Sequence, residues 1–380
     1  MKNARKRWSL GASLTLVAGS LLMVATPMAA NAAPSPNACS QQPRVGHIAG
    51  IVSAIGHCSS KGASITSDPA QGTPPLIFHG GSVMMTPSTS PLVITPIFWN
   101  PSGHTMASAY KSLISTYIAD VAAASGQTTN VYSVANEYSG SNGQIHYSVS
   151  AGAAINDTNG LPRSGCTVAS NDRSGIYADG TGYNACLDDA QLQSQINSVT
   201  AARGLPHNLS HIYVLFLPKA VESCFNAGST TTSANQCTIN HNPSAAFCAY
   251  HSEATSSAIY ANMPFPVYES STGFTCGTEA NFGVVESPNN NPDADVEISP
   301  TSHEVNEAIT DPDTATGWFD SSGFENGDEC AFVFGGTQGN AGQLFNQTIN
   351  GGHFLTQEEF SNKDFAITGG GCVQSANAEA

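Results

Sequence analysis

Residues 303–307, with the sequence HEVNE, constrain the fold of this 380-residue chain more than any other stretch. In the H-E-x-x-H motif of zinc proteases, two histidines one helical turn apart face one metal, and the glutamate beside the first is the general base. Here Glu307 occupies the second histidine position. Residues i and i+4 share a helix face, so His303 and Glu307 can reach one ion if this segment is helical. The motif therefore predicts a metal-site helix near residues 299–311, with Glu304 offset toward a water at the metal.

The third protein ligand is predicted from spacing, and two candidates remain open. Glu325 lies 18 residues after Glu307, a distance similar to that of the downstream glutamate in gluzincin-type peptidases. Asp328 follows soon after and could be an acidic partner of the ligands. Asp313 is the rival, because it occupies the metzincin position of the third ligand, ten residues after the first. We favour Glu325, because Thr310 replaces the small residue that lets a metzincin chain turn at this point.

Three further residues have both a ligand interpretation and a structural one. Asp311 and Asp313 follow the predicted helix, and an Asx turn that ends the helix fits them at least as well as metal binding. His251 ends a short apolar run and could be a further ligand, although a histidine hydrogen-bonded to backbone fits somewhat better. The oxygen-rich stretch at residues 289–297 (NNNPDADVE) favours a polar turn over a calcium loop, because it lacks the calcium-loop spacing.

One histidine with two or three carboxylates is a harder ligand set than the usual zinc triad. Zn²⁺ is the ion that the motif favours most, but this set also admits Mn²⁺, or Ca²⁺ with more oxygen ligands. Each carboxylate lowers the net positive charge at the ion and makes water there less acidic. The sequence contains no G-x-S-x-G elbow and no phosphate-binding loop, and nothing positions the glutamates of residues 357–362 (QEEFSN) as a glycosidase pair.

The N-terminus has the pattern of a bacterial secretory signal over residues 1–32. A basic start precedes a mostly apolar stretch, and residues 30–32 (ANA) offer a cleavage site near Ala32. Cleavage there removes four of the 12 basic residues and leaves 8 Lys+Arg against 28 Asp+Glu, a net charge of −20. Such a surface repels nucleic acid and anionic membranes. No later segment is long and apolar enough to span a bilayer, so a secreted, extracellular protein is predicted.

Ten cysteines remain in the predicted mature chain, an even number that favours disulfide bonds in an exported protein. No CxxC pair occurs, which argues against a cysteine zinc site. Sequence does not fix the pairing of ten cysteines. We expect pairs that are close in the chain, namely Cys39–Cys58, Cys166–Cys186 and Cys330–Cys372.

The elements predicted along the chain favour a single mixed α/β (α+β) domain over residues 76–375, preceded by a Pro/Ser/Gly-rich extension over residues 33–75. Apolar and alternating runs predict the strands, at residues 91–99, 131–134, 145–149, 211–217, 247–251 and 257–261. Helical spacing predicts two helices before the metal-site helix, at residues 106–124 and 187–202. Ser299 as N-cap and Pro300 in the first turn predict the start of the metal-site helix.

Five stretches occur in a fixed order along this domain: residues 76–81 (LIFHGG), 96–99 (PIFW), 247–251 (FCAYH), 288–289 (PN) and 302–312 (SHEVNEAITDP). Their order resembles the EXORDIUM-like, phosphate-induced protein family of plants and its secreted bacterial relatives, over roughly residues 76–375. That family is linked to extracellular growth signalling. The resemblance implies an extracellular location and a His-Glu-x-x-Glu stretch that looks like a zincin active site.

Together these features predict a zincin-like, metal-dependent peptidase whose substrate is an extracellular protein or peptide. In that role His303, Glu307 and Glu325 hold a divalent ion, and Glu304 is the catalytic base. The alternative is a non-catalytic extracellular or cell-wall binding or signalling protein with a structural metal site. The two hypotheses share the metal and differ in whether water reaches it.

Overall fold

A computed structural model of the chain describes residues 68–231, 236–238, 247–268 and 276–378. The predicted signal peptide at residues 1–32, most of the predicted extension and the expected Cys39–Cys58 pair lie outside these residues. Within the described ranges, no helix is long and apolar enough to cross a membrane.

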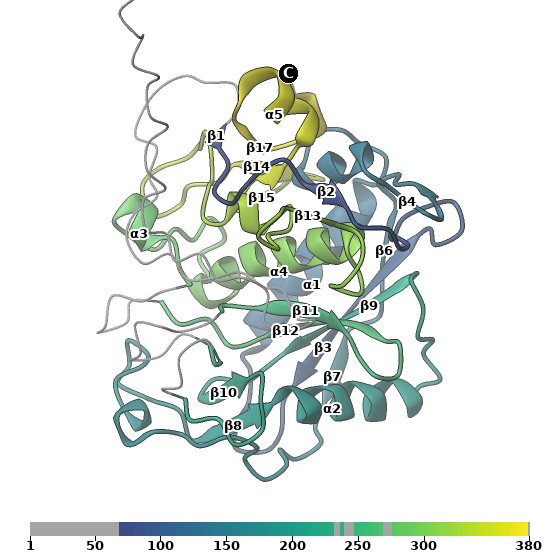
Figure 1. The fold of residues 1–380 in the computed structure, drawn as a ribbon. Coiled ribbons are helices and arrows are strands. Elements are labelled where there is room, and N and C mark those ends of the chain that lie inside the picture. Colours follow the sequence, from purple (N-terminus) through teal and green to yellow (C-terminus); the bar gives the residue numbers. More distant parts are fainter. Residues whose placement is uncertain (1–67, 232–235, 239–246, 269–275, 379–380) are drawn as a thin grey trace, which may run out of the picture. The chain divides into compact units, whose positions relative to one another are not determined.

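The centre of the fold is a six-stranded mixed sheet (Figure 1). Its order is β11 (Tyr250–Glu253), β12 (Ile259–Met263), β9 (His211–Phe216), β3 (Leu92–Trp99), and then β6 (Val149–Ala151) and β7 (Ile155–Asp157), which both pair with β3. All neighbouring pairs are parallel except β11 with β12, so β11 is an antiparallel edge strand. The predicted mixed fold with a central sheet is confirmed.

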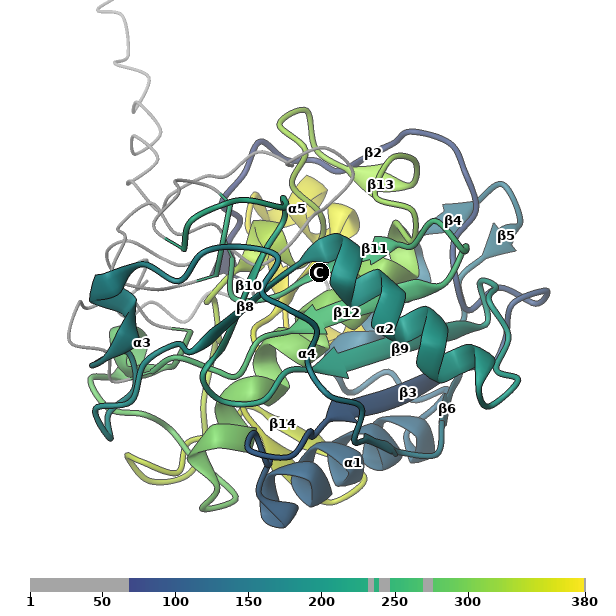
Figure 2. The ribbon, with the colours of Figure 1, turned by 90° about the horizontal axis from the view of Figure 1, so that it is seen from below.

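Helices cover both faces of this sheet (Figure 2). Side chains alternate along β9, so Val214 and Phe216 pack into one apolar cluster with α1 (Ser108–Ala123) and α4 (Pro292–Thr310). Leu215 points the other way, into a second cluster with α2 (Asp189–Ala201). The alternation follows from the two-residue period of a strand. It puts α4, which carries the HEVNE motif, directly against the sheet.

Helix α4 begins seven residues before the predicted start, so the predicted N-cap at Ser299 is wrong. Pro292 is the proline at the helix start, where its missing N–H costs nothing, and Pro300 lies inside the helix. Both prolines are compatible with a first turn when judged from sequence alone. Every residue from Ala294 to Thr310 is buried, so packing on all sides holds the helix together across the missing donor at Pro300.

The oxygen-rich stretch at residues 289–297 forms a polar turn up to Asn291 and continues as the start of α4. The Asp295 carboxylate accepts hydrogen bonds from the Ser287 hydroxyl at 2.6 Å and from the backbone N–H groups of Asn289 at 3.1 Å and Asn291 at 3.3 Å. A carboxylate in the first turn also interacts favourably with the helix dipole. The polar-turn interpretation holds up to Asn291, and the part from Pro292 is helix.

The structure agrees with some of the other predicted helices and strands and differs from the rest. Helices α1 and α2 and strands β3 and β9 lie where apolar spacing predicts them. The predicted strand at residues 131–134 is wrong, because this segment is the 3₁₀ helix η1 (Val131–Glu137), whose start the Asn130 side chain caps by accepting the Tyr132 N–H. Of the predicted strand at residues 145–149, only Val149 belongs to a strand.

The remaining elements are short. They are β1 (Asp68–Pro69), β2 (Ile77–Phe78), β4 (Ser139–Gly140), β5 (Gly143–Gln144), η2 (Ser170–Arg173), β8 (Ala185–Asp188), β10 (Val221–Cys224), α3 (Glu279–Phe282), β13 (Trp318–Phe319), η3 (Asp328–Cys330), β14 (Gln347–Ile349), β15 (Gly352–Phe354), β16 (Glu359–Phe360), α5 (Asn362–Thr368), β17 (Gly371–Val373) and η4 (Ala376–Ala378). Among them, η3 and β16 lie beside α4 and contribute to the site described below.

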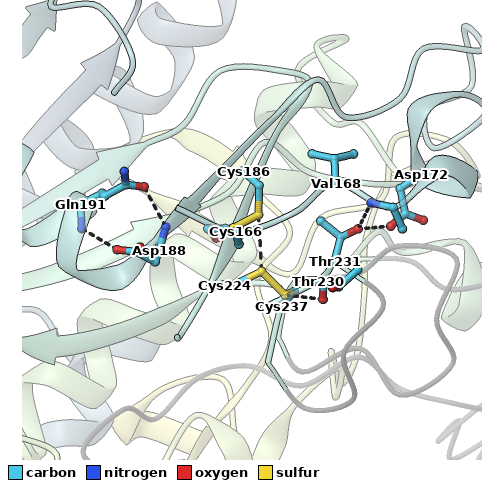
Figure 3. The surroundings of a disulfide bond; sticks show 12 residues. Cys166, Val168, Asp172, Cys186, Asp188, Gln191, Cys224, Thr230, Thr231 and Cys237 are labelled. Atoms are coloured by element: carbon cyan, nitrogen blue, oxygen red, sulfur yellow. Dashed lines mark hydrogen bonds between the residues drawn. A yellow bond between two sulfur atoms is a disulfide. The ribbon is translucent and has the colours of Figure 1, made fainter. Parts of the chain in front are cut away.

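Four disulfide bonds connect the described cysteines. The expected pairs Cys166–Cys186 and Cys330–Cys372 are confirmed, and Cys224–Cys237 and Cys248–Cys276 complete the set. The disulfides Cys166–Cys186 and Cys224–Cys237 lie side by side, with Cys186 Sγ 3.6 Å from Cys224 Sγ (Figure 3). Cys330–Cys372 ties the segment with η3 to β17, and so anchors one wall of the candidate site.

The disulfides give a first testable prediction. No described cysteine is free, and we expect Cys39 and Cys58 to pair as well. Thiol titration of the denatured, unreduced mature protein should therefore detect no reactive thiol, and the same titration after reduction should detect all ten cysteines. Detection of two or more thiols before reduction would contradict the prediction.

Candidate metal centre

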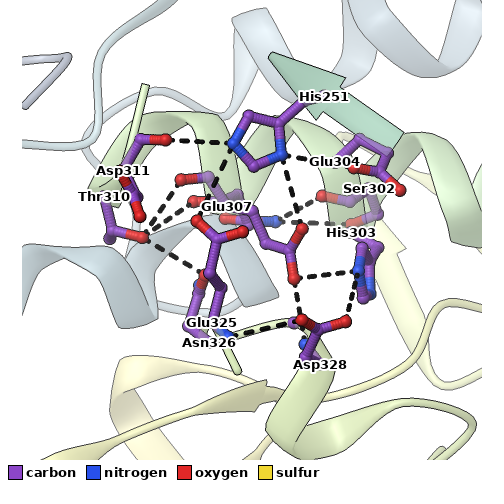
Figure 4. A network of polar contacts seen from close by, with 12 residues as sticks. His251, Ser302, His303, Glu304, Glu307, Thr310, Asp311, Glu325, Asn326 and Asp328 are labelled. Carbon is purple, nitrogen blue, oxygen red and sulfur yellow. Dashed lines mark hydrogen bonds and ion pairs between the residues drawn. The ribbon is translucent and has the colours of Figure 1, made fainter. Parts of the chain in front are cut away.

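Ionisable side chains from three segments meet next to α4, in the interior of the domain (Figure 4). One segment is α4 itself, the second is the edge strand β11, and the third is the loop that ends in η3. They contribute His303, Glu304 and Glu307; His251; and Glu325 and Asp328. His251 follows Tyr250 on β11, and because Tyr250 packs toward α2, the strand alternation turns His251 toward α4.

On one side of the centre, His303 faces two carboxylates. Its Nε2 lies 2.9 Å from Glu307 Oε1 and 3.7 Å from Asp328 Oδ1. The backbone N–H of Asp328 donates to the same Glu307 oxygen at 3.0 Å. Gly327 packs on the imidazole, since a Cβ there would lie 2.7 Å from His303 Nδ1. A glycine therefore lets the loop approach closely enough to bring Asp328 to His303.

On the other side, His251 faces three carboxylates and one carbonyl. Its Nε2 is 3.0 Å from the carbonyl oxygen of Asp311 and 3.8 Å from Glu325 Oε1. Its Nδ1 is 3.3 Å from Glu304 Oε2 and 3.4 Å from Glu307 Oε2. A carbonyl oxygen can only accept a hydrogen bond, so Nε2 carries a proton. The two oxygens of Glu307 therefore point to different histidines.

Each charged group of the centre shifts the pKa of its neighbours. Burial alone would lower the pKa of His303, but the Glu307 carboxylate, followed by Glu304 and Asp328, raises it to about 10. Burial would likewise lower the pKa of His251, and the Glu325 charge with the contacts to Glu304 and Glu307 raises it. Burial would raise the pKa of Glu307, yet the two histidines lower it to about 2.

The other carboxyls of the centre behave in the opposite way. Burial raises the pKa of Glu304, Asp328 and Glu359, and the charge of Glu307 adds to this effect. No lysine or arginine among the described residues is buried. Ionised carboxylates in this interior therefore need protons or cations as counter-charges, because isolated charges are costly to bury.

The donor set fits a divalent cation. Imidazole nitrogen and carboxylate oxygen are ligands of zinc and manganese. Glu307 Oε2 is buried, and its contact with His251 Nδ1 is long, at 3.4 Å, so this oxygen is available as a ligand. One atom each of His303, Glu304 and Glu307 lie within 4.8 Å of one another, and the same is true of His251, Glu307 and Glu325. These buried groups can hold a metal ion.

The structure separates the candidate residues predicted from sequence. His303, Glu304, Glu307, Glu325, Asp328 and His251 come together, whereas Asp311 contributes its carbonyl and Asp313 serves the turn after α4. Asp313 Oδ1 accepts from the backbone N–H groups of Ala315 at 2.9 Å and Thr316 at 2.7 Å, which is the Asx-turn interpretation.

Sequence reasoning missed two residues of the centre. Glu359, at the start of β16, accepts a hydrogen bond from the Asn326 side chain at 3.0 Å. Asn326 also accepts from the Thr310 hydroxyl at 3.2 Å, and so links the loop to the end of α4. Neither residue has a spacing to HEVNE that would indicate it. The sequence signal for Glu359 is its position next to Glu358, because two adjacent glutamates are unusual in a chain with so few charged residues.

Comparison with known proteins adds no family assignment. The chain matches no protein-family model, and no curated protein or solved structure is significantly similar to it. The EXORDIUM-like resemblance therefore stays a prediction.

Two buried glutamates outside the centre give a pH prediction. Burial raises the pKa of Glu222 and Glu297 well above the ordinary value, and the nearby Asp172 and Asp293 raise it further. The folded protein then holds these protons more tightly than the unfolded chain. This stabilisation is fully present below the unfolded-chain pKa of about 4.3 and is lost as pH rises through the raised folded pKa.

We expect the unfolding temperature of the wild type to fall more steeply from about pH 5 to about pH 8 than that of Glu222→Gln or Glu297→Gln, because an amide does not ionise. The matched control is Glu253→Gln, which removes an exposed carboxyl and should keep the wild-type slope. Scanning calorimetry at matched metal content measures all four proteins. Equal slopes would show that these carboxyls do not carry the pH dependence.

Proposed function

We propose that this chain is a secreted, zincin-like metallohydrolase that cleaves peptide bonds in extracellular proteins or peptides. The observation that carries the proposal is the HEVNE helix itself. His303 and Glu307 face each other one helical turn apart in the interior, at 2.9 Å, with Glu304 beside them. Zn²⁺ is the ion proposed for this set, with Mn²⁺ or Ca²⁺ as alternatives.

The proposed roles follow from the contacts. His303 and Glu307 hold the ion, and the loop from Glu325 to Asp328 supplies the next carboxylates. A divalent ion, when bound, supplies Lewis acidity that activates water and polarises a carbonyl. Glu304 takes the proton from the attacking water and passes it to the leaving amine. Its raised pKa suits the first step, because a carboxylate with a higher pKa is a stronger base toward the attacking water.

A peptide is the substrate class best supported by the sheet. Strand β11 is its antiparallel edge, and it carries His251 of the centre. Sheet edges bind extended peptides by adding them as a further strand. A substrate strand next to β11 would lie close to α4, which is in contact with β11 and β12.

Burial supports a second candidate function. His251, His303, Glu304, Glu307 and Glu325 all have 0% of their surface exposed. A closed centre that water cannot reach stabilises a fold and does no chemistry. The chain would then be a non-catalytic extracellular binding or signalling protein with a structural ion.

Cleavage of an unbiased peptide library by the mature protein separates these functions. The hydrolase should cleave peptides, lose the activity in the presence of a chelator, and regain it when Zn²⁺ or Mn²⁺ is restored. Intact peptides under Zn²⁺, Mn²⁺ and Ca²⁺, with metal still bound to the protein, would overturn the hydrolase in favour of the structural site.

A further inference from the structure

We infer that Glu307 bridges two cations, so that the centre is binuclear. This inference rests on the proposed metal centre and adds a second ion, held by His251, Glu307 and Glu325. The HEVNE motif alone specifies one ion. The second site is visible only after β11 and the loop before η3 are brought to α4 (Figure 4).

The centre divides into two similar halves about Glu307. In one half, Glu307 Oε1 is 2.9 Å from His303 Nε2, and Asp328 is the loop carboxylate next to that histidine, at 3.7 Å. In the other, Glu307 Oε2 is 3.4 Å from His251 Nδ1, and Glu325 is the loop carboxylate, at 3.8 Å from His251 Nε2. Each half contains one histidine, one oxygen of Glu307 and one carboxylate of the same loop. In the second half Glu307 and Glu325 face different nitrogens of the ring, and one ligand atom each of His251, Glu307 and Glu325 still lie within 4.8 Å of one another.

The distances around His251 Nδ1 fit a cation in the second half. The Nε2 of this ring donates to the Asp311 carbonyl, so Nδ1 is the nitrogen that faces the oxygens of Glu304 and Glu307. The two separations, 3.3 and 3.4 Å, exceed those of strong charge-assisted hydrogen bonds, which are about 2.7–2.9 Å. Two ligands of one tetrahedral zinc ion lie roughly 3.3 Å apart, which matches.

The composition of the centre also fits a second ion. Five buried carboxyl groups surround the two histidines, namely Glu304, Glu307, Glu325, Asp328 and Glu359, and no lysine or arginine among the described residues is buried. The contact of Glu307 Oε2 with His251 Nδ1 is long, at 3.4 Å. A second ion between these two atoms would give each oxygen of Glu307 its own cation.

The test is the zinc stoichiometry of the mature protein. Metal is removed by chelator, Zn²⁺ is added back in a calorimetric titration, and the desalted protein is analysed for zinc. We expect two ions per chain for the wild type, one for His251→Ala and one for His303→Ala. The matched control is His353→Ala, which removes an exposed histidine and should keep two.

Each outcome has a separate meaning. No bound zinc in the wild type overturns the metal centre and with it the proposed function. One ion, lost in His303→Ala and retained in His251→Ala, overturns only the bridge, and shows that a proton occupies the second half. If the variants do not fold, electron paramagnetic resonance of wild-type protein loaded with Mn²⁺ decides: a spin-coupled spectrum supports the bridge, and a single-ion six-line spectrum contradicts it.

Discussion

Removal of the divalent ion should lower the unfolding temperature of the mature protein by on the order of 10 °C. An ion present at about 1,000 times its dissociation constant stabilises the folded state by about 4 kcal/mol, and each kcal/mol shifts the midpoint of a domain of this size by a few degrees. Without the ion, the buried carboxylates around His303 and Glu307 lose their counter-charge. Scanning calorimetry with and without chelator measures the shift.

His303→Ala is the variant that tests the assignment of this shift. It should reproduce the effect of the chelator, and the chelator should then cause little further change. The exposed His353→Ala variant should respond to the chelator as the wild type does. A wild type that is unaffected by chelator under conditions where its ion is fully removed would argue against a stabilising metal.

Glu304→Gln should lower the turnover of peptide substrates by about two to four orders of magnitude while leaving the bound metal in place. The amide keeps the size of the side chain but cannot accept the proton of the attacking water. Glu297→Gln is the matched control, because it changes a buried glutamate of the same helix whose pKa responds to Tyr110 and Asp293 rather than to the centre. It should retain turnover.

Metal content has to be measured together with kcat, because the two measurements distinguish a catalytic base from a metal ligand. If Glu304→Gln lost metal as readily as His303→Ala, Glu304 would be a ligand and not a base. Its position 3.3 Å from His251 Nδ1 makes this comparison necessary, because that distance suits either role.

Local sequence patterns predict the helices and strands whose burial follows a single regular period. Strands β3 and β9 are apolar runs buried on both faces, and α1 and α2 have one apolar stripe each, so period and length identify them. Residues 131–134 contain the same β-branched and aromatic types, yet the Asn130 cap and burial of successive side chains produce η1 instead. Composition alone does not separate these two cases.

Sequence spacing predicts only those residues of the candidate centre that lie on one helix. His303, Glu304 and Glu307 share α4, so their proximity follows from helical spacing. His251 is brought in by the hairpin of β11 and β12, which pairs with the distant strand β9 and contacts α4, and no local spacing encodes these long-range contacts. Glu325 and Asp328 belong to one loop but face different histidines, and the close packing of Gly327 on His303 is what brings Asp328 to that histidine.

A divalent metal ion in the centre next to α4 should be visible by anomalous X-ray diffraction from crystals of the mature protein, recorded on both sides of the zinc absorption edge. We expect an anomalous peak at ligand distance, about 2.0–2.2 Å, from His303 Nε2 and a Glu307 oxygen. A zinc-loaded crystal whose anomalous map contains no peak within reach of His303 and Glu307 would contradict it.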